Sequence, residues 1–188
     1  MGHCHGPRST EHSPPTQAAH RTHDPPGRHA ERRSPRAKGA GRRGGQRILH
    51  AGEVSASAEV ARMLGLAEQA TVVVRRRLIE LDGEPTELTD TYYPADIAGG
   101  TPLAGTAKIR GGAVTLLAGL GHIGVRVVEN VTARMPSAEE REQLHLSPAE
   151  PVLQLSRATY DSADRAIQAD VMVMPAGRQQ LQYEIRIG

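Results

Sequence analysis

The chain has 188 residues, of which 38% are hydrophobic and only 2% aromatic, with no Trp and no Phe. This length suits one ordinary domain with a tail, and its core has to be built from aliphatic side chains. Cys4 is the only cysteine, which excludes an internal disulfide and fits a reducing, cytoplasmic location. No apolar run approaches the roughly 20 residues that a membrane-spanning helix needs, so we expect no membrane partner.

The net charge of +2 conceals two segments of opposite sign. Residues 1–47 carry ten Lys or Arg and three Asp or Glu, whereas residues 48–188 carry thirteen and eighteen. The first segment has no apolar period and is rich in Pro, Gly, His, Arg and Ser, which predicts a disordered basic tail. Its arginines are either simply solvated or contact nucleic acid phosphates without specificity. The metal-ligand residue types His3, Cys4 and His5 lack a fold to fix their geometry, so we expect incidental affinity and no metal site.

A folded domain is predicted over residues 48–188, where helical and strand patterns alternate. Capping residues and glycines delimit three predicted helices: Ser57–Leu66, Ala113–Leu120 and a helix that begins at Ser137. Alternating and β-branched runs predict six strands: Val72–Ile79, Thr86–Tyr93, Val125–Met135, Val152–Tyr160, Ile167–Met174 and Gln182–Ile187. Asp82-Gly83 is a hairpin turn signal between the first two strands.

The two ends of this domain resemble each other at an offset of 80 residues, which becomes 81 after the turns. The matching pairs are Ser57-Ala58-Glu59 with Ser137-Ala138-Glu139, Val72 with Val152, Arg77 with Arg157, and Pro94 with Pro175. Two such copies can bury their apolar faces in one antiparallel sheet about a pseudo-twofold axis. A pocket is expected where the halves meet. Arg77 and Arg157 either approach that junction from opposite sides or face solvent.

The ordered series of segments 57–66, 72–78, 81–85 and 91–96 resembles the UTRA domain of the HutC subfamily of GntR-type transcription regulators. Later motifs agree with it: Gly111-Gly112 before a helix, Leu120-Gly121-His122, Thr132-Ala133-Arg134-Met135-Pro136 and Arg157-x-x-Tyr160-Asp161. The similarity covers essentially all of residues 48–188. It implies the chorismate-lyase-like α/β (α+β) fold, a mainly antiparallel sheet with flanking helices. It also implies binding of a small effector, and dimerisation that alters how attached DNA-binding domains sit on an operator.

Members of this family carry an N-terminal winged helix-turn-helix, but residues 1–47 show no amphipathic helix, so no recognition helix is predicted. Truncation, a frameshift through the lost segment and a stand-alone sensor all stay open. So does a dominant-negative role, in which the domain dimerises with intact relatives. The expected partners are therefore a small-molecule metabolite and a second regulator chain, as a homodimer or a heterodimer. DNA is a partner only if a helix-turn-helix is supplied elsewhere.

The resemblance also implies where the ligand binds. Family members commonly carry an Arg-x-Arg pair before the Asp-Gly turn, and here Arg77 fills the first place and Ile79 the second. A helix start such as Gly112 is a family anion site, although here it is equally well a plain helix start. The complete set of expected ligand-binding residues is Arg77, Thr89, Thr91, Gly112, Ala113, Glu129, Arg157, Gln168 and Asp170. This set is polar and nearly neutral, which favours a neutral or zwitterionic metabolite over a sugar phosphate.

Catalytic signatures are missing from the predicted domain. It has no nucleophile elbow, no Cys and no metal-spaced group of His and Cys residues. The acidic pair Glu139-Glu140 lies in a helix first turn, where it complements the helix dipole. The sequence therefore favours a sensor that is not an enzyme and has no catalytic residues, cofactor or metal. A pure protein-interaction module is the remaining class.

Overall fold

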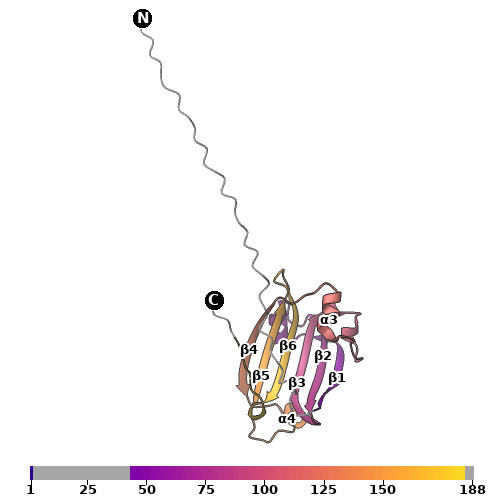
Figure 1. Cartoon of the computed structure of the whole chain (residues 1–188), viewed down its shortest axis with the longest axis vertical. Coiled ribbons are helices and arrows are strands. Elements are labelled where there is room, and N and C mark those ends of the chain that lie inside the picture. The colour runs from indigo at the N-terminus through magenta and orange to yellow at the C-terminus, as the bar shows by residue number, and fades with distance from the viewer. Residues whose placement is uncertain (2–42, 185–188) are drawn as a thin grey trace.

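The computed structural model describes Met1 and residues 43–184, and these form one six-stranded antiparallel sheet (Figure 1). The strands lie in the order β1-β2-β3-β6-β5-β4. Their bounds are Gly44–Ser55 (β1), Thr71–Leu81 (β2), Glu84–Pro94 (β3), Arg126–Arg134 (β4), Val152–Tyr160 (β5) and Ala166–Pro175 (β6). The helices are Ala58–Leu64 (α1), Ala95–Ala98 (α2), Gly112–Gly119 (α3) and Ala138–Gln143 (α4), with 3-10 turns at Pro102–Ala104 (η1) and Ala176–Arg178 (η2). The predicted fold class, a mainly antiparallel sheet with flanking helices, is confirmed.

Strand β1 was not among the predicted strands. It pairs with β2 along its whole length, from Gly44 opposite Leu81 to Ser55 opposite Thr71. Most of its side chains are exposed, so the strand lacks the alternation of apolar and polar residues that marks a half-buried strand. The strand begins at Gly44, whereas the folded domain was expected to begin at Ile48. The predicted tail lies otherwise outside the described residues, as does the His3-Cys4-His5 cluster.

The strand predicted over Gln182–Ile187 is wrong for its described part. Gln182, Tyr183 and Glu184 have no regular secondary structure, and the remaining residues lie outside the described range. The reason is that Leu181, just before them, packs its side chain against the cluster of Leu155, Met172 and Met174. The segment thus begins by covering a sheet face, which the alternating sequence pattern does not distinguish from strand pairing.

The hairpin between β2 and β3 turns at Asp82 and Gly83, as predicted. Both residues have positive φ angles, 56° for Asp82 and 84° for Gly83. Two successive left-handed residues form the turn whose twist matches that of the flanking strands. Arg43 N also donates a hydrogen bond of 2.7 Å to Asp82 Oδ1, which joins the start of β1 to this turn.

The internal repeat corresponds to a pseudo-twofold axis in the middle of the sheet. The halves β1-α1-β2-β3 and β4-α4-β5-β6 meet where β3 pairs with β6. Asp90 lies opposite Val171 in this pairing, and these two residues are also equivalent at the repeat offset of 81. The axis therefore passes between them, at the seam where a pocket was expected.

Both faces of the sheet are covered, which explains the unbroken apolar run Val72-Val73-Val74 in β2. Helix α1 packs over Val72 and Ala169 on one face. Leu144 and Leu146, at the end of α4, pack on that same face further along the strands. The opposite face carries Val73, Tyr93 and Ile167, which are covered by the segment from α2 to α3.

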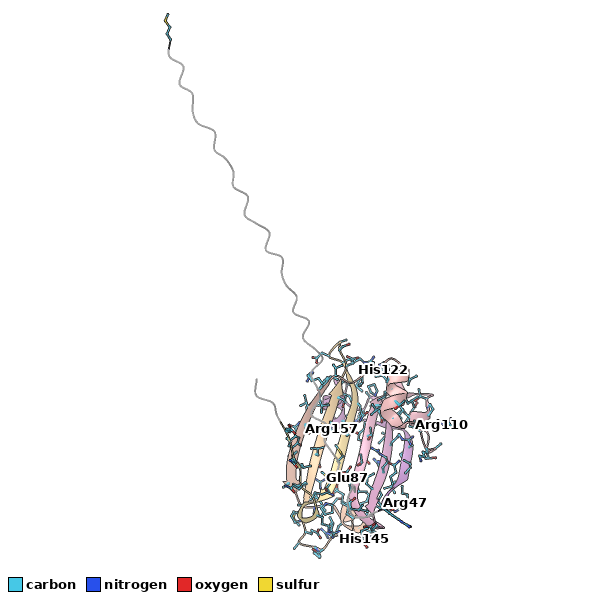
Figure 2. All side chains as sticks on the ribbon, viewed as in Figure 1. Arg47, Glu87, Arg110, His122, His145 and Arg157 are labelled. Carbon is cyan, nitrogen blue, oxygen red and sulfur yellow. The ribbon has the colours of Figure 1, made fainter. Side chains whose placement is uncertain are left out.

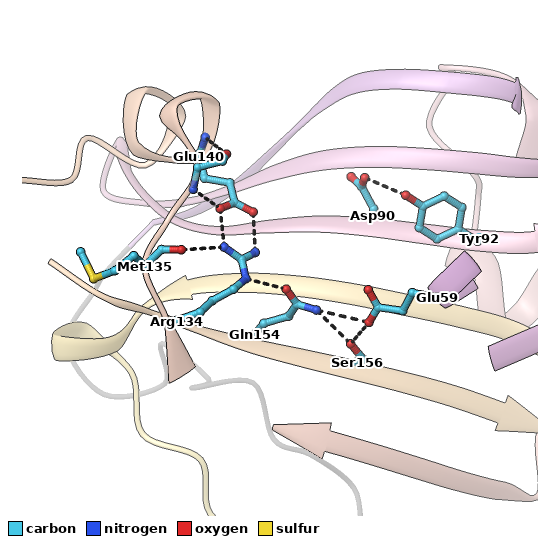
Figure 3. Close-up of polar contacts among 9 residues, drawn as sticks. Glu59, Asp90, Tyr92, Arg134, Met135, Glu140, Gln154 and Ser156 are labelled. Carbon is cyan, nitrogen blue, oxygen red and sulfur yellow. Dashed lines mark hydrogen bonds and ion pairs between the residues drawn. The ribbon is translucent and has the colours of Figure 1, made fainter. Parts of the chain in front are cut away.

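Glu140 in the first turn of α4 holds this helix to strand β4. Its carboxylate accepts hydrogen bonds from Arg134 at 2.6 and 2.7 Å and from Ser137 N at 2.8 Å (Figure 3). The Ser137 side chain in turn accepts from Glu140 N, which completes a capping box. The hydrogen bonds from Arg134 hold the pKa of Glu140 below its usual value, although partial burial opposes them.

We predict a pH-dependent stability difference between the wild type and Glu140→Gln. A carboxyl whose folded-state pKa is lowered stabilises the fold above its unfolded pKa, and this stabilisation is lost as the pH falls through the folded value. At pH 7 the variant should lose about 1 kcal/mol of unfolding free energy. The difference should vanish at a pH well below the ordinary value of 4.5.

Urea unfolding at a series of pH values measures this difference. Glu139→Gln is the matched control, because Glu139 is the neighbouring acid of the same helix turn and accepts a hydrogen bond from Gln143 of the same helix. A loss in Glu140→Gln that is the same at every pH would show that the charge of Glu140 does not contribute.

Candidate ligand-binding site

A row of polar side chains crosses the sheet face that α3 covers. Arg77 and Thr91 share this face with Val73 and Tyr93, because side chains two or four positions apart in a strand point to the same side. Strand register then brings Thr91 opposite Asp170, Asp170 opposite Arg157, and Arg157 opposite Glu129. The row therefore runs from β2 through β3, β6 and β5 to β4.

Asp170 is the centre of this row. It is only 5% exposed, and its carboxylate accepts hydrogen bonds from Thr91 Oγ1 at 2.7 Å and Gln168 Nε2 at 2.8 Å. Thr91 Oγ1 itself accepts from Arg77 Nη2 at 2.8 Å. Four residues expected from the sequence thus form one connected hydrogen-bond network. The hydroxyl of Thr91 bridges the Arg77 guanidinium and the buried Asp170 carboxylate.

The two equivalent arginines differ in their partners. Arg157 donates from Nε to Glu129 Oε1 at 2.5 Å, and its position on the sheet is visible in Figure 2. The strand position opposite Arg77 is taken by Ile48, which offers no carboxylate. Within the described residues, Arg77 Nε is buried without a hydrogen-bond partner. Arg77 therefore keeps a donor for which the rest of the described chain supplies no acceptor.

Thr89 lies two positions before Thr91 in β3, on the same face, and is buried. Its hydroxyl donates to the carboxylate of Glu87, which is labelled in Figure 2. Glu87 was not predicted as a site residue. Its position two residues before Thr89 and four before Thr91 in one strand is the signal from which it could have been predicted.

Arg75 is a second residue that was not predicted, although it lies two positions before Arg77. It is 6% exposed and donates to the carbonyl oxygens of Pro102 at 3.1 Å, Leu103 at 3.3 Å and Ala107 at 3.2 Å, and also to that of Gly105. Burial lowers the pKa of its guanidinium, and the nearby Tyr93 opposes this. Arg75 thus fixes the backbone of residues 102–107 over the site face, where four carbonyl dipoles solvate its charge.

The sequence model of the UTRA domain matches residues 39–180 of this chain. The chain belongs to the UTRA domain family. It is 33% identical over 155 residues to an uncharacterised HTH-type transcriptional regulator of Streptomyces coelicolor, a match that covers 80% of this chain and 57% of the relative. This UTRA chain therefore spans little more than half the length of that regulator.

Solved structures with this fold include domains of proteins described as transcription regulators. One is the ligand-binding domain of a protein from Bordetella bronchiseptica assigned to the GntR family, with 27% identity and a TM-score of 0.61 over 78% of this chain and 91% of that one. Another is the C-terminal domain of the histidine utilization repressor from Pseudomonas syringae pv. tomato, with 20% identity and a TM-score of 0.62 over 77% and 100%. At this identity the second likeness supports the fold alone, and the family match identifies the chain as a UTRA domain.

The predicted residues Gly112 and Ala113 lie at the start of α3, which covers the sheet face that carries the polar row. Gly112 N donates to the carbonyl of Ile109 at 3.1 Å, and Ala113 packs in the apolar cluster beneath α3. Gly111 and Gly112 both have positive φ angles, 79° and 84°, which explains the glycine pair. Of the nine predicted ligand residues, four therefore form one hydrogen-bonded network, Arg157 and Glu129 form a separate ion pair, and Thr89 bonds to Glu87.

A shallow groove of about 420 Å³ lies on the opposite face of the sheet, between α4 and β1. Its floor includes Asp90 and Val171, at the pseudo-twofold axis. Asp90 is already paired with Arg76 at 3.2 Å and accepts from Tyr92 Oη at 3.1 Å (Figure 3). Burial raises the pKa of Asp90, and burial together with Asp90 raises the pKa of Tyr92 to about 12. We assign no ligand to this groove, because its central charge is already satisfied.

The residues that the structure describes contain no group of three or more His, Cys, Asp or Glu side chains arranged to hold a metal ion. No helix within them is long and apolar enough to cross a membrane.

We predict that Arg75→Leu loosens the segment over the site. The substitution leaves four carbonyl oxygens without their shared donor, and the loss of charged hydrogen bonds should cost about 2–4 kcal/mol of unfolding free energy. Hydrogen exchange of the amides from residue 101 to 110 should accelerate by at least about tenfold. Arg76→Leu is the matched control, because Arg76 lies on the other face and is half exposed, with one ion pair. Equal acceleration in both variants would contradict the role given to Arg75.

Proposed function

We propose that this UTRA domain is the effector-sensing part of a GntR-type transcription regulator and binds a small neutral or zwitterionic metabolite at the polar row. The observation that carries this proposal is the network of Arg77, Thr91, Asp170 and Gln168 beside a buried Arg77 Nε without an acceptor. Buried polar groups are normally satisfied, so an unused buried donor in a polar row favours a ligand as its partner.

The charges of the row favour this class of ligand. Arg77 and Arg157 are balanced by Asp170 and Glu129, so the row offers both signs of charge and no net excess of either. A guanidinium suits a carboxylate, and the carboxylate of Asp170 suits an ammonium or a hydroxyl group. A phosphate dianion would be repelled by Asp170, whereas an amino acid derivative or an uncharged polyol would meet complementary groups.

The same proposal covers the role of the whole regulator. Ligand binding in this domain would alter dimerisation and the position of attached DNA-binding segments, and no substrate would be turned over. The relative from Streptomyces coelicolor is an HTH-type transcriptional regulator, and the Bordetella bronchiseptica structure is a ligand-binding domain of a protein assigned to the GntR family. A second regulator chain is the proposed protein partner, and DNA is a partner only if a helix-turn-helix is supplied elsewhere.

A thermal-shift screen identifies the ligand class. The panel should contain amino acids and their derivatives, neutral sugars and polyols, and the corresponding sugar phosphates. A ligand that binds only the folded state raises the melting temperature by mass action. Stabilisation by the first two groups, with no chemical change of the compound after incubation, is the expected result. Turnover of a hit would contradict the sensor proposal.

We predict that Arg77→Gln weakens binding of such a hit by about 10- to 100-fold, because it removes a charged hydrogen-bond donor from the site. Isothermal titration calorimetry measures the change. Arg76→Gln is the matched control, since Arg76 is the next residue of β2 and its ion-pair partner Asp90 lies on the opposite face. Unchanged affinity in Arg77→Gln would place the ligand elsewhere.

A further inference from the structure

A row of apolar side chains lies beside the polar row, on the same face of the sheet. Strand register places Met172 of β6 opposite Leu155 of β5, and Leu155 opposite Val131 of β4. Met172 follows Asp170 by two positions in β6, so the two rows are about 6.5 Å apart along the strands. The apolar row therefore begins next to the centre of the proposed ligand site.

The burial of this apolar row changes along its length. Leu155 and Met172 are 0% and 4% exposed, whereas Val131, on the edge strand, is 43% exposed. The row thus has a closed end beside Asp170 and an open end at the margin of the sheet. A chain that lay along it would run from the polar row to the molecular surface.

The apolar row has a different kind of cover from the rest of the sheet. The other apolar clusters are covered by α1, by the segment from α2 to α3, or by the end of α4. Within the described residues, Leu181 is the apolar side chain from outside the strands that packs on the cluster of Leu155, Met172 and Met174. Leu181 belongs to a segment, residues 179–184, without regular secondary structure.

Few hydrogen bonds hold this segment on the sheet. Gln179 Nε2 donates to the carbonyl oxygen of Thr86 at 3.2 Å. From residue 180 to residue 184, no backbone hydrogen bond joins the segment to the rest of the described chain. Leu181 itself is only partly buried. Segments with few buried contacts open at a low cost in free energy, so Leu181 is a cover that a ligand can displace.

The two methionines suit a surface whose occupant is exchanged. A methionine side chain is unbranched, flexible and polarisable, and it adapts its shape to different neighbours. Met172 and Met174 can therefore repack around a ligand group in place of Leu181. Leu155, which is fully buried between them and β4, supplies the fixed part of the floor.

We infer that the row of Met172 and Leu155 is a second, apolar subsite of the ligand site, which takes an aliphatic chain of the ligand in place of Leu181. This inference rests on the proposed function and narrows its ligand class to a zwitterion with an aliphatic side chain. Arg77 Nε binds the carboxylate, Asp170 accepts from the ammonium group, and the chain lies over Met172. A neutral sugar or polyol has no group that fits such a row.

Calorimetric titration of the full chain with a series of straight-chain α-amino acids tests the inference. The probes are alanine, 2-aminobutanoate, norvaline and norleucine. Each methylene that reaches the apolar row should lower the dissociation constant about fourfold, because it is removed from water. Leu181→Ser should strengthen norleucine binding by about tenfold, since the competing side chain is gone, and should leave alanine binding unchanged. Gln182→Ser is the matched control, because Gln182 is the next residue of the segment and is exposed.

Nuclear magnetic resonance of the wild type gives a second measurement that does not depend on the folding of Leu181→Ser. The chain has five methionines, whose methyl groups can be labelled with ¹³C. Met172→Leu, which conserves volume, identifies the Met172 signal. Norleucine should shift this signal and alanine should not. The methyl signal of Met63, which packs with α1 on the other face of the sheet, should stay in place in both titrations.

Three results would overturn the inference: a dissociation constant that does not fall along the series, weaker norleucine binding in Leu181→Ser, or a Met172 signal that norleucine leaves unmoved. If alanine binds and the longer homologues gain nothing, the apolar subsite is wrong and the sensor proposal stands. If no member of the series binds, the inference is wrong, and the sensor proposal then depends on the neutral compounds of the thermal-shift screen.

Discussion

Asp170 is buried in the middle of a sheet that is covered on both faces, so its charge has to be matched by hydrogen-bond donors from its own neighbourhood. An unpaired carboxylate at this depth would cost several kcal/mol. Thr91 and Gln168 satisfy its two oxygens, and Arg77 reaches it through Thr91. The positions of these side chains depend on the central pairing of β3 with β6, and the remaining polar groups of the row are arranged around that pair.

The pseudo-twofold symmetry of the sheet makes the differences between its halves informative. Equivalent positions would give both arginines equivalent partners, yet Arg157 has Glu129 opposite it and Arg77 has Ile48. In one half of the row Arg157 forms an ion pair with Glu129, and in the other half Arg77 Nε has no hydrogen-bond partner among the described residues. On the opposite face the asymmetry recurs, because Glu59 of α1 is bonded to Ser156, whereas Arg76, equivalent to Ser156, pairs with Asp90.

Local patterns predicted the elements whose formation depends on local chemistry. The turn at Asp82, the Ser137 cap and the two related hairpins follow from residue types at short spacing. Strand β1 was not predicted because backbone hydrogen bonds with β2 stabilise it, and backbone pairing does not require particular side chains. Arg75 escaped for a related reason: its acceptors are carbonyl oxygens 27 to 32 residues away, which any sequence provides. The family resemblance put Arg77, Thr91, Gln168 and Asp170 in one expected set, and the structure joins them by hydrogen bonds, but the resemblance could not tell which arginine would lack a partner.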